Sequence, residues 1–89
     1  STFQVEIVVE AMDRTRLLVD VSTAISDAGG NIVSCGTKTD KNGISNLRFL
    51  VELSNVKALD PLLHRLASYE GVFDARRALP GESSRKKSS

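Results

Sequence analysis

The chain has 89 residues, of which 40% are hydrophobic and 26% charged, and its formal net charge at pH 7 is +1. These values are typical of one folded domain with a modest core, and they exclude a disordered chain. They also argue against a dedicated nucleic-acid binder, because a basic excess occurs only at the far C-terminus.

The sequence offers no sign of a membrane span, a secretory signal or a metal site. No apolar run approaches the roughly 18 residues of a membrane helix, and no signal peptide is recognisable. The single cysteine, Cys35, has no partner for an internal disulfide, which fits a reducing cytosol. The chain lacks an initial Met and enters a strand almost at once, so we interpret it as a domain of a longer protein. We expect a cytoplasmic location, no metal and no cofactor.

The first predicted element is a strand over about residues 3–11, where apolar and polar residues alternate. The period changes to 3.6 across the polar stretch 13–18, which predicts a helix over about residues 15–28. Asp13 is placed to cap the first amides of this helix, and Gly29 to end it in the left-handed conformation. A capped helix start is also a ready anion site, although the same pattern is typical of an ordinary strand-to-helix turn.

A second strand is predicted from Asn31 to about Thr39. Gly36, at its small and polar centre, indicates a bulge or the close approach of another backbone. The stretch 40–43 (Asp-Lys-Asn-Gly) predicts a tight hairpin turn, because Asn-Gly suits positive φ angles. The third strand then has apolar residues in alternation, namely Leu47, Phe49, Val51 and Leu53.

The second helix carries the apolar stripe Val56, Leu59, Leu62, Leu63, Leu66 and Tyr69, after a cap at Ser54 or Asn55. Pro61 disturbs this pattern, since a proline in a helix interior costs about 3 kcal/mol. We expect one helix with an irregular first turn, ended by Gly71. A last strand is predicted over Val72 to Leu79, and residues 80–89 are predicted to be a disordered polar and basic tail.

The order β-α-β-β-α-β predicts an α+β, ferredoxin-like fold over residues 1–79: a four-stranded antiparallel sheet with two helices on one face. The apolar residues of the first and third strands are expected to face the helices. The second strand is expected at an edge of the sheet, without proline and with few charges. Because such an edge invites pairing with another chain, we expect a homodimer.

No catalytic constellation is recognisable. His64 falls beside the leucine stripe of the second helix, with no nucleophile near it in the sequence, so we interpret it as structural. Asp40 and Asp74 are interpreted as solvated carboxylates. Arg76 and Arg77 alternate between faces and are either solvated or in contact with an anion such as RNA phosphate. The outer sheet face lacks the aromatic pair that base stacking needs.

These residues resemble the ACT domain family. The resemblance rests on Val5, Ile7, Val9, Ala11, Asp13, Arg14, Leu17, Leu18, Asp20 and Val21, followed by Gly30-Asn31-Ile32, Thr37 to Thr39, Leu53 and Gly71-Val72. The segments 13–22 and 71–77 resemble most closely the C-terminal ACT domain of the long RelA/SpoT enzymes, which make and hydrolyse (p)ppGpp. The resemblance covers about residues 3–79.

What the resemblance implies is a regulatory, non-catalytic domain that binds an amino acid where two domains meet. Carried over residue by residue, the ligand-binding positions are Asp13, Arg14, Thr15, Arg16, Leu17, Leu18, Asn31 and Ile32. Leu17 or Leu18 with Ile32 fits a branched-chain amino acid. Many ACT domains have glycine where this chain has Arg16, and glycine lets the backbone approach the ligand.

The leading hypothesis is therefore an amino-acid-sensing domain of a RelA/SpoT-type GTP pyrophosphokinase or (p)ppGpp hydrolase, acting in the stringent response. A second hypothesis is an interaction module that docks on ribosomal RNA or on the catalytic half of its parent chain. Its binding residues would be Arg48, Arg65, Arg76, Arg77 and Arg85-Lys86-Lys87. A third is an ACT module of an amino-acid biosynthetic enzyme.

Overall fold

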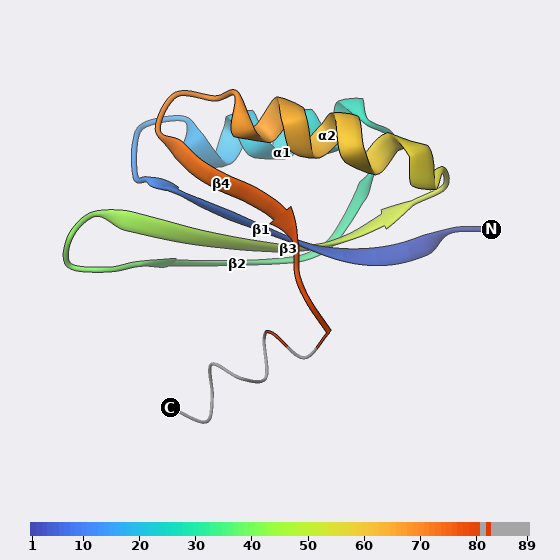
Figure 1. Cartoon of the computed structure of the whole chain (residues 1–89), viewed down its shortest axis with the longest axis horizontal. Helices are drawn as coiled ribbons and strands as arrows, with labels where there is room; N and C mark the ends of the chain where they lie inside the picture. The colour runs from blue at the N-terminus through green and yellow to red at the C-terminus, as the bar shows by residue number, and fades with distance from the viewer. Residues whose placement is uncertain (81, 83–89) are drawn as a thin grey trace.

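The structure, a computed structural model, describes residues 1–80 and residue 82. Its elements are β1 (Phe3–Met12), α1 (Leu17–Asp27), β2 (Asn31–Thr39), β3 (Ile44–Leu53), the 3₁₀ turn η1 (Val56–Ala58), α2 (Leu59–Ala67) and β4 (Val72–Arg77). The strands form one antiparallel sheet in the order β2-β3-β1-β4, and both helices lie on one face of it (Figure 1). The predicted ferredoxin-like α+β fold is confirmed.

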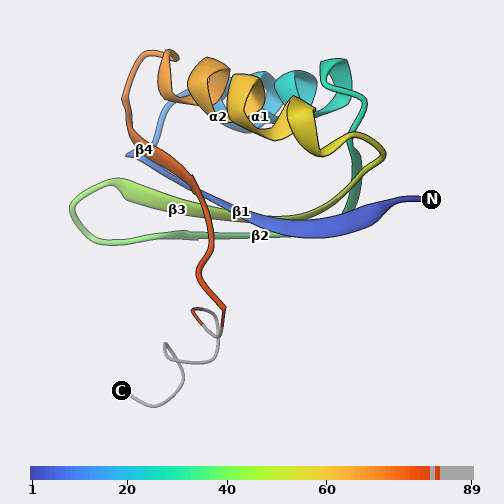
Figure 2. The same cartoon turned by 45° about the vertical axis from the view of Figure 1, so that its right-hand side comes forward.

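The core lies between the helices and the inner face of the sheet (Figure 2). Every second residue of β1 and β3 points into it, because successive side chains of a strand alternate between faces. The strand residues of the core are Val5, Ile7, Val9, Ala11, Leu47, Phe49, Val51 and Leu53, and those of the helices are Leu17, Val21, Ala24, Ile25, Leu59, Leu62 and Leu66. The predicted inner face of both strands is therefore confirmed.

The start of α1 differs from the prediction. The helix begins at Leu17, its N-cap is Arg16, and no side chain caps its amides, so the predicted cap by Asp13 is wrong. The reason is that the amide of Asp13 donates to the carbonyl of Gly43 at 2.9 Å, which continues the β1–β3 pairing past the end of the strand. Asp13 is thereby held in line with β1, and the chain turns into the helix only after Arg14.

The second helix has the irregular first turn that was predicted. The Asn55 side chain accepts a hydrogen bond from the amide of Lys57 at 2.9 Å and caps η1, and α2 follows directly from Leu59. Pro61 therefore lies in the first turn of α2, where its missing N–H removes no helical hydrogen bond. The helix ends at Ala67, before the predicted end at Gly71, and Gly71 has φ 85° directly before β4.

β2 is an edge strand, as predicted. Its bulge lies at Val33, where the register with β3 shifts between Ile32 and Ser34, and not at Gly36. Gly36 pairs regularly with β3, and in the described part of the chain a Cβ there would meet no atom within 4 Å, so no described neighbour requires a glycine at this position.

The hairpin turn between β2 and β3 is confirmed. Gly43 has φ 81°, and the Asp40 carboxylate accepts hydrogen bonds from the amides of Asn42 and Ile44 at 2.8 and 3.0 Å. Asp40 is thus a turn-forming residue, which explains why a hairpin closes here.

β4 ends at Arg77, two residues before the predicted end. The chain then continues on the side of the sheet away from the helices (Figure 1, Figure 2). Most of the predicted disordered tail, residue 81 and residues 83–89, lies outside the described residues. In the part of the chain that is described, no helix is long and apolar enough to cross a membrane.

Candidate functional site

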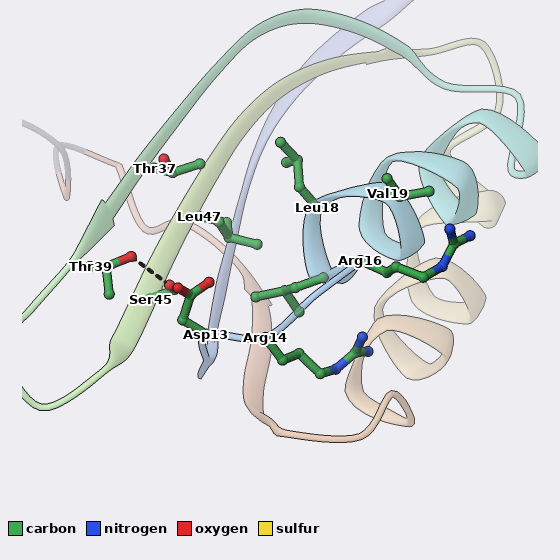
Figure 3. A pocket seen from close by; sticks show the side chains of 10 residues that line it. Asp13, Arg14, Arg16, Leu18, Val19, Thr37, Thr39, Ser45 and Leu47 are labelled. Atoms are coloured by element: carbon green, nitrogen blue, oxygen red, sulfur yellow. Dashed lines mark hydrogen bonds between the residues drawn. The ribbon is translucent and has the colours of Figure 1, made fainter.

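A cavity of about 250 Å³ opens where β1 passes into α1, above the ends of β2 and β3 next to the hairpin (Figure 3). Its lining residues are Asp13, Arg14, Arg16, Leu17, Leu18, Val19, Thr37, Thr39, Ser45 and Leu47. The volume is slightly below the usual range of ligand pockets, about 300–1,000 Å³, and suits a molecule of amino-acid size.

Five of the eight predicted site residues line this cavity, namely Asp13, Arg14, Arg16, Leu17 and Leu18. Thr15 belongs to the same turn but does not line the cavity. Asn31 and Ile32 lie at the other end of β2, six and five positions before Thr37, which is roughly 16–20 Å along a strand. Within one chain, the structure does not bring Asn31 and Ile32 together with the turn.

The inner end of the cavity is polar. Ser45 is only 2% exposed, and its hydroxyl lies 2.7 Å from the hydroxyl of Thr39 (Figure 3). Asp13 lies beside them, because it follows Ala11, the cross-strand partner of Ser45, by two residues. The polar end is therefore a group of oxygen acceptors, one carboxylate and two hydroxyls, which suits a ligand group that donates hydrogen bonds.

Arg14 shapes the turn. Its guanidinium donates to the Asp20 carboxylate at 3.0 Å, to the Thr15 carbonyl at 3.0 Å and to the Glu70 carbonyl at 2.9 Å. These three acceptors occupy the side chain and join the turn both to α1 and to the segment between α2 and β4. Arg14 therefore fixes the rim of the cavity, and its charge is already paired.

Arg16 adopts the left-handed conformation, with φ 71° and ψ 5°, and among the described residues no other non-glycine has a positive φ. Its side chain extends away from Thr39 and Ser45 (Figure 3). The polar end of the cavity consequently faces no guanidinium from this turn.

The first turn of α1 supplies amides on the other side of the cavity. The Leu17 amide donates to the Arg14 carbonyl at 3.2 Å, whereas those of Leu18 and Val19 have no backbone acceptor in the described part of the chain. The first amides of a helix attract negatively charged groups, which the helix dipole reinforces. A carboxylate would find two donors here.

The sequence pattern did not indicate five of the cavity residues, namely Val19, Thr37, Thr39, Ser45 and Leu47. Ser45 carried a usable signal, since it stands two residues before Leu47 in the alternation of β3, where an apolar residue would be expected. A hydroxyl on the inner face of a sheet needs a partner or a function.

No group of three or more His, Cys, Asp or Glu residues that could hold a metal occurs within residues 1–80 and 82. His64, on α2, is exposed and takes no part in the cavity.

Comparison with known protein families matches residues 1–77 to the ACT domain. The chain belongs to the ACT domain family. The resemblance inferred from the turn and the strand pattern is therefore confirmed. The backbone at Arg16 is left-handed, a conformation that glycine adopts without strain and other residues adopt only at a cost.

Similar curated proteins are much longer than this ACT domain. It is 41% identical over 81 residues to the GTP pyrophosphokinase of Streptomyces antibioticus, covering 91% of this chain and 10% of that protein. It is 42% identical over 77 residues to the bifunctional (p)ppGpp synthase/hydrolase RelA of Mycobacterium tuberculosis, covering 86% of this chain and 10% of that protein. The chain thus spans about a tenth of the length of these relatives.

A solved structure shares the fold. The crystal structure of the ACT domain from the GTP pyrophosphokinase of Chlorobium tepidum aligns with 88% of this chain and 100% of its own, with a TM-score of 0.75 and 23% identity.

Proposed function

We propose that this ACT domain is the regulatory, non-catalytic part of a RelA/SpoT-type GTP pyrophosphokinase or (p)ppGpp hydrolase, and that it senses a small amino acid in the cavity at the start of α1. Similarity to GTP pyrophosphokinases over most of the chain supports the class of the parent protein. The observation that carries the ligand assignment is the cavity itself, with free amides on one side and oxygen acceptors on the other. By binding its ligand, the domain would regulate the parent enzyme in the stringent response.

The three parts of an amino acid match three parts of the cavity. Its carboxylate would accept hydrogen bonds from the amides of Leu18 and Val19. Its ammonium would donate to the Asp13 carboxylate and the Ser45 hydroxyl. An apolar side chain would pack on Leu47, and the small volume favours valine or isoleucine over an aromatic amino acid.

The substitution Asp13→Asn tests this assignment. It keeps the shape of the residue but removes the charge that pairs with the ligand ammonium, so we expect valine or isoleucine to bind about 10- to 100-fold more weakly. Binding is measured by calorimetry or by titration followed with NMR. The matched control is Asp60→Asn in α2, which lies outside the cavity and should bind like the unaltered chain. Equal affinity of the Asp13→Asn variant, with the fold intact, would contradict the proposed ammonium site.

A second copy of the chain is the proposed route by which Asn31 and Ile32 reach a ligand. The resemblance places ligands where two domains meet, and β2 offers a free edge that begins at these residues. Pairing of two chains would bring the start of β2 from one copy toward the other copy. Under this proposal Asn31→Ala weakens amino-acid binding only when the chain is a dimer, whereas Asp13→Asn weakens amino-acid binding in both the monomer and the dimer.

The alternative, an interaction module that binds ribosomal RNA, receives less support. Three of its candidate cations are paired with carboxylates: Arg48 with Glu6, Arg65 with Asp27, and Arg76 with Glu10. Arg77 is exposed, and the basic cluster at 85–87 lies outside the described residues. Binding to RNA that falls steeply with salt, without any response to amino acids, would favour this alternative.

A further inference from the structure

Val8 is fully buried although it belongs to the sheet face that carries no helix. Its neighbours Ile7 and Val9 point into the core, and Val8 is not part of that core. Its cross-strand partners are Arg48 on β3 and Arg76 on β4. The centre of the outer face is thus an apolar side chain between two arginines.

Glu82 bridges these two arginines. Its Oε2 lies 2.5 Å from Nη2 of Arg76 and 3.9 Å from Nη2 of Arg48, and its Oε1 accepts a hydrogen bond from the amide of Leu79 at 3.0 Å. The side chain is only 15% exposed. Because the two arginines flank Val8, a carboxylate that reaches both must lie across Val8.

We propose that Glu82 is an intramolecular latch that holds Leu79 at the outer sheet face, and that its opening uncovers Val8 and loosens the end of β4. The backbone pairing of β4 continues only to Ala78, whose amide donates to the Glu6 carbonyl at 2.8 Å. Beyond it, the Leu79 amide donates to the Glu82 carboxylate at 3.0 Å, and the Leu79 carbonyl accepts from the Glu82 amide at 3.0 Å. The first of these two hydrogen bonds depends directly on the latch.

The charges around the two arginines favour a tethered carboxylate over a free anion. Besides Glu82, the guanidinium of Arg48 contacts Glu6, and that of Arg76 contacts Glu10 and Asp74. With the latch open, three carboxylates still face two arginines, so a dissolved phosphate would be repelled. Glu82 belongs to the same chain as the two arginines, so the effective concentration of its carboxylate beside them is high. It can therefore bind there without the net positive charge that a dissolved anion would need.

The latch should open in acid. The hydrogen bond from the Leu79 amide and that from Arg76 lower the pKa of Glu82. A carboxyl group with a lowered pKa stabilises the closed state above its ordinary pKa of about 4.3, and this contribution is lost as the pH falls through the lowered value. The other charged groups that face it are Glu6 and Glu10 on β1, Arg48 on β3, and Asp74 and Arg76 on β4.

Hydrogen exchange of the 89-residue chain, followed by NMR at pH 7, tests the latch through Glu82→Gln. We expect the Ala78 amide to exchange about tenfold faster in this variant, with a shifted Val8 methyl resonance and an unchanged Phe49 amide. The control is Glu52→Gln: Glu52 also lies on the outer face, but among the described residues it accepts from Gln4 and Asn31 and not from β4, so Ala78 should exchange as in the unaltered chain. The proposal would be overturned if the Ala78 amide of Glu82→Gln exchanged within about twofold of its rate in the unaltered chain, or if the Phe49 amide were accelerated as much as that of Ala78.

Two conditions sharpen the experiment. As the pH falls through the lowered pKa of Glu82, the ratio of Ala78 exchange rates between Glu82→Gln and the unaltered chain should approach one, because Glu82 becomes protonated. Inorganic phosphate, added at constant ionic strength, should leave exchange in the unaltered chain unchanged. Acceleration specific to phosphate would show instead that the two arginines form a site for free anions, and would also overturn the proposal.

Discussion

At the scale of the residue, Arg16 decides the shape of the turn before α1. Its φ of 71° lies in the left-handed region, where a side chain costs about 1–2 kcal/mol because Cβ crowds the following carbonyl oxygen. Hydrogen bonds hold both sides of the turn: the Arg14 side chain donates three, and the Arg16 carbonyl accepts from the Asp20 amide at 2.9 Å. These hydrogen bonds therefore hold Arg16 in its strained left-handed conformation.

We expect Arg16→Gly to stabilise the domain by up to about 1 kcal/mol, since glycine removes the strain and loses part of that gain to its greater freedom in the unfolded chain. Amino-acid binding should stay equal or become tighter, because the Arg16 side chain extends away from the polar end of the cavity. Urea denaturation measures the stability and calorimetry the affinity.

Arg16→Ala is the matched control, since it removes the guanidinium but keeps the strained backbone. It should not show the stabilisation that glycine gives. If amino-acid affinity fell in both variants, the arginine itself would be a ligand clamp, contrary to the expectation.

At the scale of the element, two adjacent glycines between α1 and β2 have different roles. Gly29 has φ 82° and open space around it, so it ends the helix. Gly30 lies against the core: a Cβ there would stand 2.8 Å from Cγ1 of Val51 and 2.9 Å from Cγ2 of Ile25. The close packing of α1 on β3 depends on the missing side chain.

Gly30→Ala should destabilise the domain by about 1–3 kcal/mol, the cost of forcing an extra methyl into a packed core. Gly36→Ala, in the centre of β2, provides the comparison, because a Cβ there meets nothing within 4 Å and its cost should be near zero. Both are measured by urea denaturation. Equal stability of the two variants would contradict the prediction, because it would mean that the core around Val51 accommodates the extra methyl group without loss of stability.

At the scale of the whole molecule, the sheet leaves one long edge open. β2 spans Asn31–Thr39, and all of its residues except Ile32 are exposed. Its unpaired amides and carbonyls are a template for a further strand, and no proline or bulge interrupts it after Val33. A symmetric pairing of two copies along β2 would satisfy these groups.

We therefore expect sedimentation to show a dimer at high micromolar concentration. If the two-fold axis passes near Cys35 and Gly36, mild oxidation should also join two chains through Cys35, which is exposed. Although Cys35 is exposed, neighbouring atoms desolvate its thiol in part and raise its pKa, so the reactive thiolate forms more readily at alkaline pH, where the crosslinking should be run. A monomer at these concentrations, with no crosslinked species, would contradict the prediction.

The sequence by itself determined the order of elements, the inner face of the sheet, the edge position of β2 and the family. These features are local or periodic: alternation fixes which side of a strand is buried, and Asn-Gly and Gly-Gly fix where the chain turns. The turn carrying Asp13, Arg14, Arg16, Leu17 and Leu18 was also found from the sequence, because the family motif covers it.

Only the tertiary structure decided what these residues meet. Asp13 does not cap α1, because pairing with the strand opposite holds its backbone in line with β1. Ser45 and Thr39 join the cavity through the register of a hairpin, and Asn31 lies at the far end of the same strand. Glu82 reaches arginines on two different strands. Such contacts join residues distant in sequence, and their partners are set by sheet register and strand order, which no local pattern of side chains encodes.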